Sequence, residues 1–594
     1  MNGQNSFRAF TWLALVAAAG AAVALYAFAL NFGNLNQDEG WYLYAAQCVA
    51  RGAVPYRDFF FTQGPVLPCV YGALAGLWSP HGVLGGRCLT LAFGFLACVM
   101  TALLARRASP RERAMEAGVL AFALTACNLY HAYFTTIPKT YGLASFLVMA
   151  GFLLLSLCVP REPKTRSMRT AMWALPAGLL IALAAGTRLS LGALLPVTAL
   201  GLLLTCRKTG AAFFWFALGG ALGLLLVFGP PLTEAREQFM FAQTFHASRL
   251  GGGHDVFLVA GSLSRSVRAY LPMAMMAAAL VLLAPLGRRT GATAGGMWAW
   301  LWLAGFLSVF LLHLAGPFPY DDYQVPVMGL LAAALAAWTV RSALGAIACG
   351  SLCLFWVAVA LAAAFGSPLP QEWMLSRQDR FWAVRKPAPD LALLRRVARE
   401  ARALSGEAEA MLLTQEAYLA VEAGMRVPEG LEMGPFAYFP ELPDEDAAKF
   451  HVLNKRMLLA LLERAPCEVA AVSGYGFAIR APVMDRVPED DVQLFWSRLT
   501  RSYDRVDEVA DFGQHCTTLQ VFKRRPGLLP PMEETPAPAP AAEPPAPAPE
   551  EAPAPAEAPA EAPAPAPAEA PAPAPAEAPP PAPAPAPAAE AVAP

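Results

Sequence analysis

The sequence predicts a polytopic α-helical membrane protein, followed by a small C-terminal α/β domain and a disordered tail. Hydrophobic residues make up 56% of the 594 residues, more than the share of about 45 to 50% in soluble proteins, and the mean hydropathy is +0.42. Long apolar runs fill residues 1–366, a mixed composition follows over 367–526, and Pro, Ala and Glu dominate 527–594. These three zones of composition define the predicted domains.

The membrane domain is predicted to contain about eleven spans, because a helix needs about 20 apolar residues to cross a bilayer. The first span, residues 10–30, is expected to stay attached as a signal anchor, since no small-residue cleavage site follows it convincingly. The others are expected at residues 84–105, 116–129, 140–159, 171–187, 191–206, 211–231, 268–286, 295–315, 323–340 and 343–365. Segment 66–78 is short and contains prolines, so we expect a surface or re-entrant helix there.

Clusters of Arg and Lys predict the orientation of these spans. They lie at 106–113, 161–169, 207–208, 288–289 and 341, and the positive-inside rule places such loops in the cytoplasm. We therefore expect the N-terminus inside. The first outer loop (31–80), the loop 232–267, the turn 316–324 and the C-terminal domain are then extracytoplasmic.

The net charge and the cysteine motifs bear on two classes of function, nucleic-acid binding and metal binding. The formal charge is −1, and no basic block is long enough to follow a phosphate backbone, which excludes nucleic-acid binding. No paired CxxC or HExxH motif indicates a resident metal. The sequence leaves open whether Cys467 pairs with Cys516, and whether Cys48 pairs with Cys69.

Strand and helix patterns alternate in the C-terminal domain. Strands are expected at 408–415, 466–474 and 516–524, and helices at 416–424, 446–464 and 490–500. This alternation favours a small sheet with covering helices, which we expect to brace the membrane domain or to contact an acceptor. The Pro/Ala/Glu-rich tail cannot bury a core, and its prolines favour an extended, disordered chain.

The stretch 31–65 brings acids, aromatic residues and an arginine together beside a hydrophobic span. Asp38 and Glu39 precede residues at helical apolar spacing, and Gly52 is a plausible helix stop. We expect this helix to lie on the membrane surface, with its aromatic side chains at headgroup level. Asp38 can simply cap the helix. A cap does not explain the polar residues that follow, which indicate a site.

This order of features resembles a known family. An acidic pair after the first span, then a helix, a glycine, the motif Pro55-Tyr56-x-Asp58 and a closing Pro65 looks like the first outer loop of polyprenyl-phosphate-dependent membrane glycosyltransferases of the GT-C class. The most similar branch contains protein mannosyltransferases, the aminoarabinose transferase of lipid A and RgtA/B/C/D-like enzymes. The resemblance extends over the membrane domain.

The resemblance implies a GT-C type membrane domain and a transferase. Such an enzyme moves a sugar from a polyprenyl-phosphate donor to an envelope lipid, polysaccharide or protein, at the outer face of a bacterial inner (plasma) membrane. Asp38 matches the catalytic aspartate of the family by position, and Glu39 is its neighbour and second candidate. A lipid phosphate is a good leaving group, so the reaction mainly needs a carboxylate base and cations that hold the phosphate.

The predicted topology supplies the cations Arg57, Lys139 and Arg188 at the outer face. Arg188 lies in a segment that resembles the "GLA..TR" span of the family, and arginine fits phosphate geometry well. The alternative for Lys139 and Arg188 is snorkelling to lipid headgroups. The residues expected to bind substrate are Tyr42, Tyr56, Arg57, Asp58, Gln63, Lys139, Arg188, Tyr320, Asp321, Asp322 and Tyr323.

Some residues depart from the family pattern. Asp321 and Asp322 stand in a turn where relatives have basic or aromatic residues, and two acids can bind a divalent metal, an amino sugar or water. We expect a solvated turn that contacts substrate. Lys139 stands near the start of a span where many relatives have an aspartate. The subfamily, and therefore the identity of the donor sugar, stays open.

Two other classes remain as alternatives. A lipid or sugar transporter or flippase would also have many spans and charges at their borders, but it should show internal repeats or broken helices at the bilayer midplane, and we find no clear repeat. A non-catalytic envelope scaffold would not need Asp38, Arg57, Lys139 and Arg188 on one side of the membrane. This shared sidedness favours the enzyme.

Overall fold

The computed structural model describes residues 2–158, 168–205, 210–248, 256–283, 294–316, 320–341, 346–366, 388–406, 410–474, 487–513 and 517–527. They all belong to one compact unit, Met1–Met532. The predicted tail after Gly527, the cationic loops at 159–167, 206–209 and 284–293, and Cys516 lie outside the described residues, and so does the Cys467–Cys516 pairing. Cys48 and Cys69 are both free thiols. The domain boundaries stay predictions.

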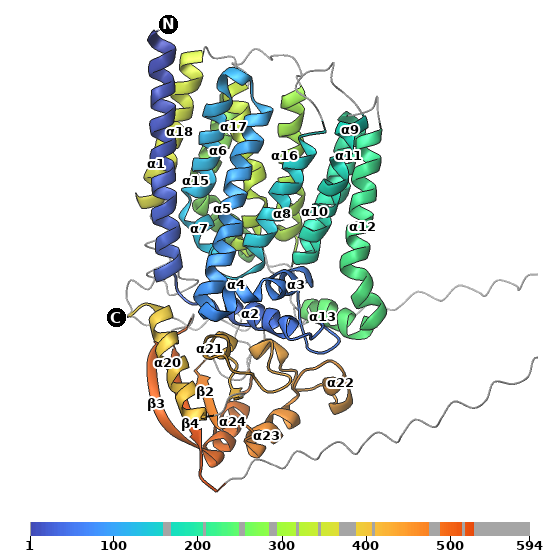
Figure 1. Cartoon of the computed structure of the whole chain (residues 1–594), viewed down its shortest axis with the longest axis vertical. Helices are drawn as coiled ribbons and strands as arrows, with labels where there is room; N and C mark the ends of the chain where they lie inside the picture. The colour runs from blue at the N-terminus through green and yellow to red at the C-terminus, as the bar shows by residue number, and fades with distance from the viewer. Residues whose placement is uncertain are drawn as a thin grey trace, which may run out of the picture. The chain divides into compact units, whose positions relative to one another are not determined.

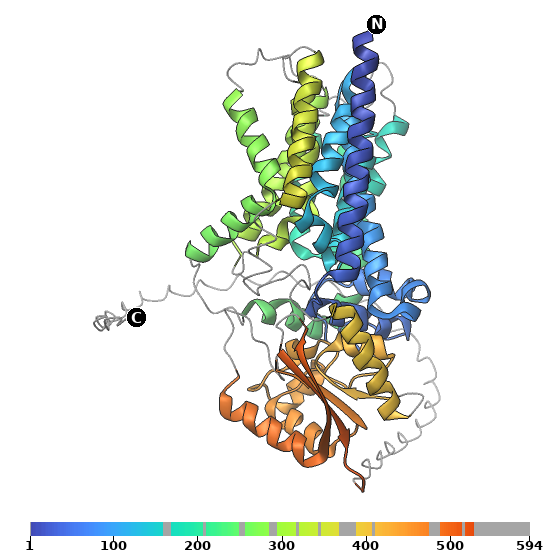
Figure 2. The same ribbon diagram turned by 90° about the vertical axis from the view of Figure 1, so that its left-hand side faces the viewer.

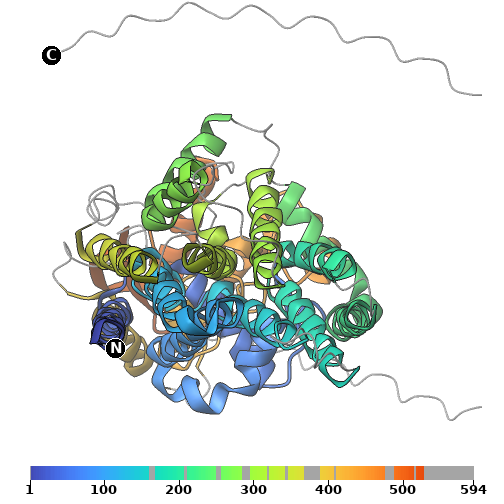
Figure 3. The ribbon, with the colours of Figure 1, turned by 90° about the horizontal axis from the view of Figure 1, so that it is seen from above.

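The membrane domain is a bundle of helices that run side by side (Figure 1). Its helices are α1 (Asn2–Phe32), α5 (Gly82–Ala108), α6 (Ala114–Ala126), α7 (Leu129–Phe134), α8 (Thr140–Leu155), α9 (Met168–Ala171), α10 (Ala174–Thr187), α11 (Leu194–Thr205), α12 (Ala211–Glu234), α14 (Val256–Ala269), α15 (Leu271–Leu283), α16 (Ala294–Leu314), α17 (Met328–Arg341) and α18 (Ala346–Gly366). Short 3-10 helices precede α6 (η2, Arg111–Arg113), α11 (η4, Leu189–Ala193) and α17 (η6, Asp321–Val327). Figure 3 looks along the bundle and shows α1 and α18 as neighbours.

A helix lies at every predicted span, because apolar runs of this length fold as helices when the backbone must satisfy its own hydrogen bonds. By length and apolar composition, 6 helices of the described residues can cross a membrane, or up to 7 if α14 and α15, bent by 92°, count as one span. Shorter apolar helices cover Thr140–Leu155, Ala174–Thr187 and Leu189–Leu204. The count of eleven crossings stays a prediction.

Short helices lie across one end of the bundle, at the end away from the N-terminus of α1 (Figure 2). They are α2 (Gln37–Ala50), α3 (Val66–Ala73), α4 (Ala75–Trp78), η1 (Ser79–His81) and α13 (Arg236–Ser248). The predicted helix after Asp38 is therefore α2. The predicted surface or re-entrant segment 66–78 is the pair α3 and α4.

The C-terminal module, residues 388–527, holds a four-stranded sheet in the order β1-β2-β4-β3. Strands β1 (Leu412–Leu413) and β2 (Val469–Ser473) are parallel, and β4 (Thr517–Arg524) pairs antiparallel with β2 and β3 (Tyr503–Phe512). The helices of the module are α20 (Asp390–Ser405), α21 (Ala417–Ala423), η7 (Gly434–Ala437), α22 (Asp444–Lys449), α23 (Lys455–Arg464) and α24 (Glu489–Ser502). The predicted α/β character is confirmed.

Two details of the module differ from the prediction. The single helix expected over 446–464 is divided, because Leu453 donates its N–H to Ala437 O at 2.8 Å and Asn454 then caps α23. Strand β3 was not predicted. It pairs only with β4 at the edge of the sheet, and its mostly exposed, charged sequence lacks the apolar alternation of a half-buried strand.

Candidate active site

A buried ion pair fixes the connection between α1 and α2. The Arg87 guanidinium, from α5, donates from Nε to Glu39 Oε2 at 2.6 Å and from Nη2 to Glu39 Oε1 at 2.7 Å. It also donates to the backbone oxygens of Gly33 and Asn34 at 2.9 and 3.0 Å. Both charged side chains are 0% exposed. Glu39 is therefore enclosed by protein, with both of its oxygens engaged.

The cap of α2 is Asn36 and not Asp38. Asp38 N donates to Asn36 Oδ1 at 3.1 Å, and Asn36 N donates to Glu39 Oε1 at 2.8 Å, which completes a capping box. The capping role considered for Asp38 is therefore wrong, since an asparagine two residues earlier takes it. The side chain of Asp38 is left for other contacts.

Asp38 meets a lysine and a second acid that are distant in sequence. Lys139, which precedes α8, places Nζ 2.9 Å from Asp38 Oδ2 and 3.2 Å from Asp322 Oδ2. The Asp38 side chain is 27% exposed, whereas those of Lys139 and Asp322 are nearly buried. Within the described residues, Asp38 Oδ1 accepts no hydrogen bond. One oxygen of Asp38 is thus held and the other is available.

The turn that contains Asp321 and Asp322 is buried, so the expectation of a solvated turn is wrong. Each residue is only 7% exposed. Arg265 Nε donates to Asp321 Oδ1 at 3.2 Å and Tyr130 Oη to Asp321 Oδ2 at 2.8 Å. Tyr141 Oη donates to Asp322 Oδ2 at 2.8 Å. Partners from other helices replace the water that these acids would otherwise bind.

Arg188 lies beside this cluster and is held by aromatic rings. Its guanidinium carbon is 3.8 Å from the centre of the Tyr323 ring and 5.3 Å from that of Tyr141. Arg188 Nε is buried without a hydrogen-bond partner, and Arg188 forms no ion pair with any described residue. A buried guanidinium with an unsatisfied donor can bind an anion.

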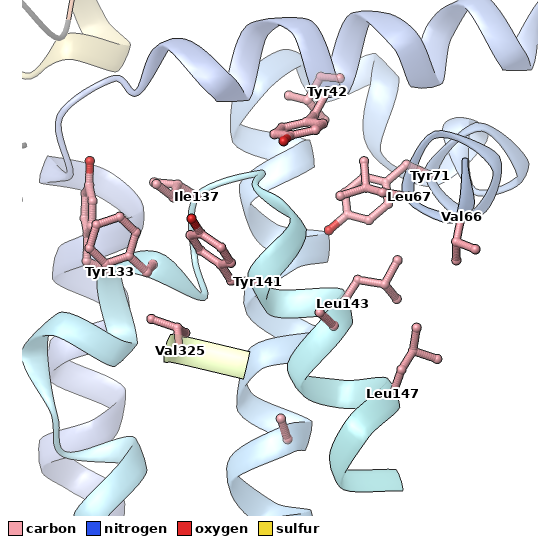
Figure 4. Close-up of a cluster of buried hydrophobic side chains, with 14 of the residues drawn as sticks. Tyr42, Val66, Leu67, Tyr71, Tyr133, Ile137, Tyr141, Leu143, Leu147 and Val325 are labelled. Carbon is pink, nitrogen blue, oxygen red and sulfur yellow. The ribbon is translucent and has the colours of Figure 1, made fainter. Parts of the chain in front are cut away.

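Tyr42 belongs to the same place. Figure 4 shows its ring on the side of α2 that faces Tyr141 and the start of α8. Burial and the charge of Asp38 raise the pKa of Tyr42, and the charges of Arg188 and Lys139 act in the opposite direction. The structure thus brings Asp38, Tyr42, Lys139, Arg188, Asp322 and Tyr323 together, with Tyr320 packed on Tyr323 at 5.4 Å between ring centres.

The other predicted residues of the first outer loop have local roles. Arg57 forms a bidentate ion pair with Asp58, with both hydrogen bonds at 2.9 Å. At the exposed surface, Arg57 Nη1 also lies 3.5 Å from Glu234 Oε2. The Arg57 guanidinium lowers the pKa of Asp58. Tyr56 is buried with a positive φ of 71° and donates its hydroxyl to the backbone oxygen of Gln63. These contacts shape the turn and do not join the cluster around Asp38.

The C-terminal module covers α2. Trp41 packs on Phe436 with ring centres 4.6 Å apart, and Tyr44 Oη accepts a hydrogen bond from Val427 N at 2.9 Å. A Cβ at Gly40 would lie 2.4 Å from Tyr418 N. The aromatic side chains expected at headgroup level are thus buried against protein, which corrects that expectation.

Sequence reasoning missed several residues of the site: Arg87, Tyr130, Tyr141 and Arg265. Arg87 did carry a signal, because an arginine inside the apolar run that forms α5 is expensive and therefore usually paired. The tyrosines carried none, since a tyrosine in an apolar helix is most often a packing residue.

The donor groups do not form an evident metal centre. Among the described residues, no group of three or more His, Cys, Asp and Glu side chains is arranged to hold a metal ion. Asp38 and Asp322 share the ammonium of Lys139 instead.

Comparisons with known proteins give the fold. No protein-family model matches the chain, and no curated protein matches it in sequence. Among solved structures, ArnT from Cupriavidus metallidurans bound to undecaprenyl phosphate is 15% identical with a TM-score of 0.55, over 88% of this chain and 99% of that one. The apo form of the same ArnT is 13% identical with a TM-score of 0.54, over 86% of this chain and 98% of that one.

An archaeal oligosaccharyltransferase from Archaeoglobus fulgidus, in complex with Zn and sulfate, is also similar. It is 13% identical with a TM-score of 0.46, over 85% of this chain and 72% of that one. The ArnT match covers both the membrane helices and the C-terminal module, since it extends over nearly the whole of each chain. The chain therefore has the fold of the GT-C glycosyltransferases, as the resemblance of its first outer loop predicted.

Proposed function

We propose that this protein is a membrane glycosyltransferase that moves a sugar from a polyprenyl-phosphate donor to an acceptor hydroxyl of the cell envelope, with Asp38 as the base. The observation that carries the proposal is the cluster at the end of the bundle nearest α2, where Asp38 is held by Lys139 on one oxygen and is open on the other. Arg188 lies in the same cluster with an unsatisfied donor.

Asp38 is a better base than Glu39. A base must reach the proton that it removes, and the Asp38 side chain is partly exposed. Glu39 is enclosed, and both of its oxygens accept hydrogen bonds from Arg87. We assign Glu39 a positioning role, in which it fixes the start of α2 and thereby the backbone of Asp38.

The proposed step conserves atoms and charge. Asp38 Oδ1 accepts the proton of the acceptor hydroxyl, and the acceptor oxygen forms a bond to the anomeric carbon of the donor sugar. The bond between that carbon and the phosphate oxygen breaks, and its electron pair leaves with the polyprenyl phosphate. Lys139 stays bound to Asp322 while Asp38 becomes neutral, so the ammonium keeps a counterion throughout.

The contacts of the cations support Arg188 as the ligand of the donor phosphate. Lys139 forms ion pairs with Asp38 and Asp322, and Arg265 forms one with Asp321. Arg188 forms no ion pair with a described residue and keeps an unsatisfied donor at Nε. One unpaired guanidinium suits one phosphate. The similar ArnT structure was solved with undecaprenyl phosphate, a ligand of this class.

The proposal includes the location of the site. The cationic residues 106–113, at the far end of α5, support an orientation with α2 and the C-terminal module outside a bacterial plasma membrane, by the positive-inside rule. The acceptor is then a lipid, polysaccharide or protein of the envelope. We do not include Arg57 and Asp58 among the residues that bind the donor, since they pair with each other at the surface.

Analysis of lipid-linked sugars tests this function. Cells that carry only the Asp38→Asn protein should accumulate one polyprenyl-phosphate sugar, and wild-type protein should remove it. An unchanged set of lipid-linked sugars, with the variant protein present at the wild-type level in the membrane, would contradict the proposal. A transporter would instead change the side of the membrane on which the lipid-linked sugar is found.

A further inference from the structure

The position of the Lys139 ammonium is the most unusual feature of the cluster. Two carboxylates approach it from different segments, Asp38 from α2 at 2.9 Å and Asp322 from η6 at 3.2 Å. The rings of Phe134 and Tyr141 have their centres 5.4 Å from the same nitrogen. Lys139 is only 9% exposed, so protein groups, rather than water, provide most of its surroundings.

Two carboxylates that face each other at a partly buried point repel unless a cation lies between them. Many transferase sites meet this need with a divalent ion bound by carboxylate oxygens. Here the ammonium lies at the point that both oxygens approach. The donor set also suits an ammonium better, since no third His, Cys, Asp or Glu among the described residues joins the two acids to form a metal site.

We propose that Lys139 is a built-in cation that takes the position a divalent metal would need between Asp38 and Asp322. Its ammonium joins α2 to η6, holds one oxygen of the proposed base and leaves the second oxygen open to the acceptor. This inference rests on the proposed function in one respect, the role of Asp38 as the base. The occupation of the cation position by Lys139 does not depend on that role.

Two consequences follow from the geometry. In the wild-type protein the Lys139 ammonium occupies the position between these acids, so the protein should neither bind a divalent ion there nor need one for transfer. Lys139→Ala removes the ammonium and leaves both carboxylates, which converts the pair into a weak divalent site. Asp322→Asn in the same background removes one of its ligands.

Mn²⁺ is the probe, and its binding to the purified full-length protein in detergent is measured by electron paramagnetic resonance. We expect no bound Mn²⁺ between these acids in the wild type, one bound Mn²⁺ per chain in Lys139→Ala, and binding weakened by at least about tenfold in Lys139→Ala with Asp322→Asn. Wild-type protein that binds Mn²⁺ in a manner abolished by Asp38→Asn would overturn the inference. So would folded Lys139→Ala that binds no more Mn²⁺ than the wild type.

Transfer provides the second measurement. Wild-type turnover should be unchanged after treatment with EDTA. The turnover of Lys139→Ala should be lower than that of the wild type by a factor of about 10² to 10⁴, as expected when a base is no longer held in place. Addition of Mn²⁺ should restore part of it. Wild-type turnover that EDTA abolishes and Mn²⁺ restores would overturn the inference even if Lys139→Ala does not fold. Failure of the proposed function is distinguishable, because full turnover in Asp38→Asn would refute the base and leave the Mn²⁺ binding results intact.

Discussion

Replacing Glu39 by Gln tests the buried ion pair that fixes the start of α2. Arg87 binds both oxygens of Glu39, at 2.6 and 2.7 Å, and neither side chain is exposed. Glutamine can still accept the hydrogen bond from Asn36 N that completes the capping box. Its NH2 group cannot accept from Arg87 Nε, so the substitution removes the charge and one hydrogen bond of the pair. Removing the charge of one member of a buried ion pair lowers the free energy of unfolding by about 3 to 5 kcal/mol. This is a large part of the total free energy of unfolding, which is typically about 5 to 15 kcal/mol.

Equilibrium unfolding of the full chain in detergent micelles measures this loss. The variant that combines Glu39→Gln with Arg87→Met removes both charges and should recover most of the lost unfolding free energy. Turnover per folded molecule should fall less than in Asp38→Asn, because Glu39 only positions the backbone of Asp38 and does not face the substrate. A Glu39→Gln protein with wild-type stability and turnover reduced by about a hundredfold or more would refute the positioning role and place Glu39 in the chemistry.

Three further predictions concern the module, the phosphate ligand and pH. Gly40→Ala should lower the unfolding free energy by about 1 to 3 kcal/mol and should also reduce turnover, because the new Cβ would lie 2.4 Å from Tyr418 N. Gly76→Ala is the matched control. Its new Cβ has nothing within 4 Å, so it should change neither stability nor turnover. Arg188→Lys keeps the charge but loses the planar fork, so it should weaken the binding of a polyprenyl phosphate, measured by calorimetry, more than it lowers the thermal unfolding temperature; equal affinity would exclude Arg188 as the phosphate ligand. Burial raises the pKa of Glu432 to about 7, so the folded protein binds that proton more tightly than the unfolded chain does. The stabilising effect of this proton is fully present below the ordinary pKa of about 4.3 and is lost as the pH rises through about 7; Glu432→Gln should flatten this part of the unfolding profile, and an unchanged profile would show that Glu432 is not the group responsible.

The sequence predicted the helices of the membrane domain well, because apolar length and composition are local properties. It also predicted α2, and the charges that flank the spans predict that Asp38, Lys139 and Arg188 share one side of the membrane. The structure groups these three residues in a single cluster.

The errors arose where partners are distant in the chain. Asp321 and Asp322 were expected in a solvated turn, but Arg265 and Lys139, which bury them, stand 56 and 183 residues away. Arg57 was expected to bind the donor phosphate, but in the structure its guanidinium pairs with the carboxylate of the next residue, Asp58. The pattern of residues along the chain does not give such distances, so which charges pair becomes visible only in the folded protein.

Turnover of the Asp38→Asn protein is the most direct test of the proposed mechanism. Asparagine has the size of aspartate, and Asn36 caps α2 whichever of the two residues stands at position 38, so the substitution removes the basic oxygen without removing the cap. The measurement is single-turnover transfer by purified protein from a polyprenyl-phosphate sugar, with donor binding determined on the same sample. We predict that transfer falls by about 10² to 10⁴ while the donor still binds; near-normal transfer by Asp38→Asn would contradict the assignment of Asp38 as the base.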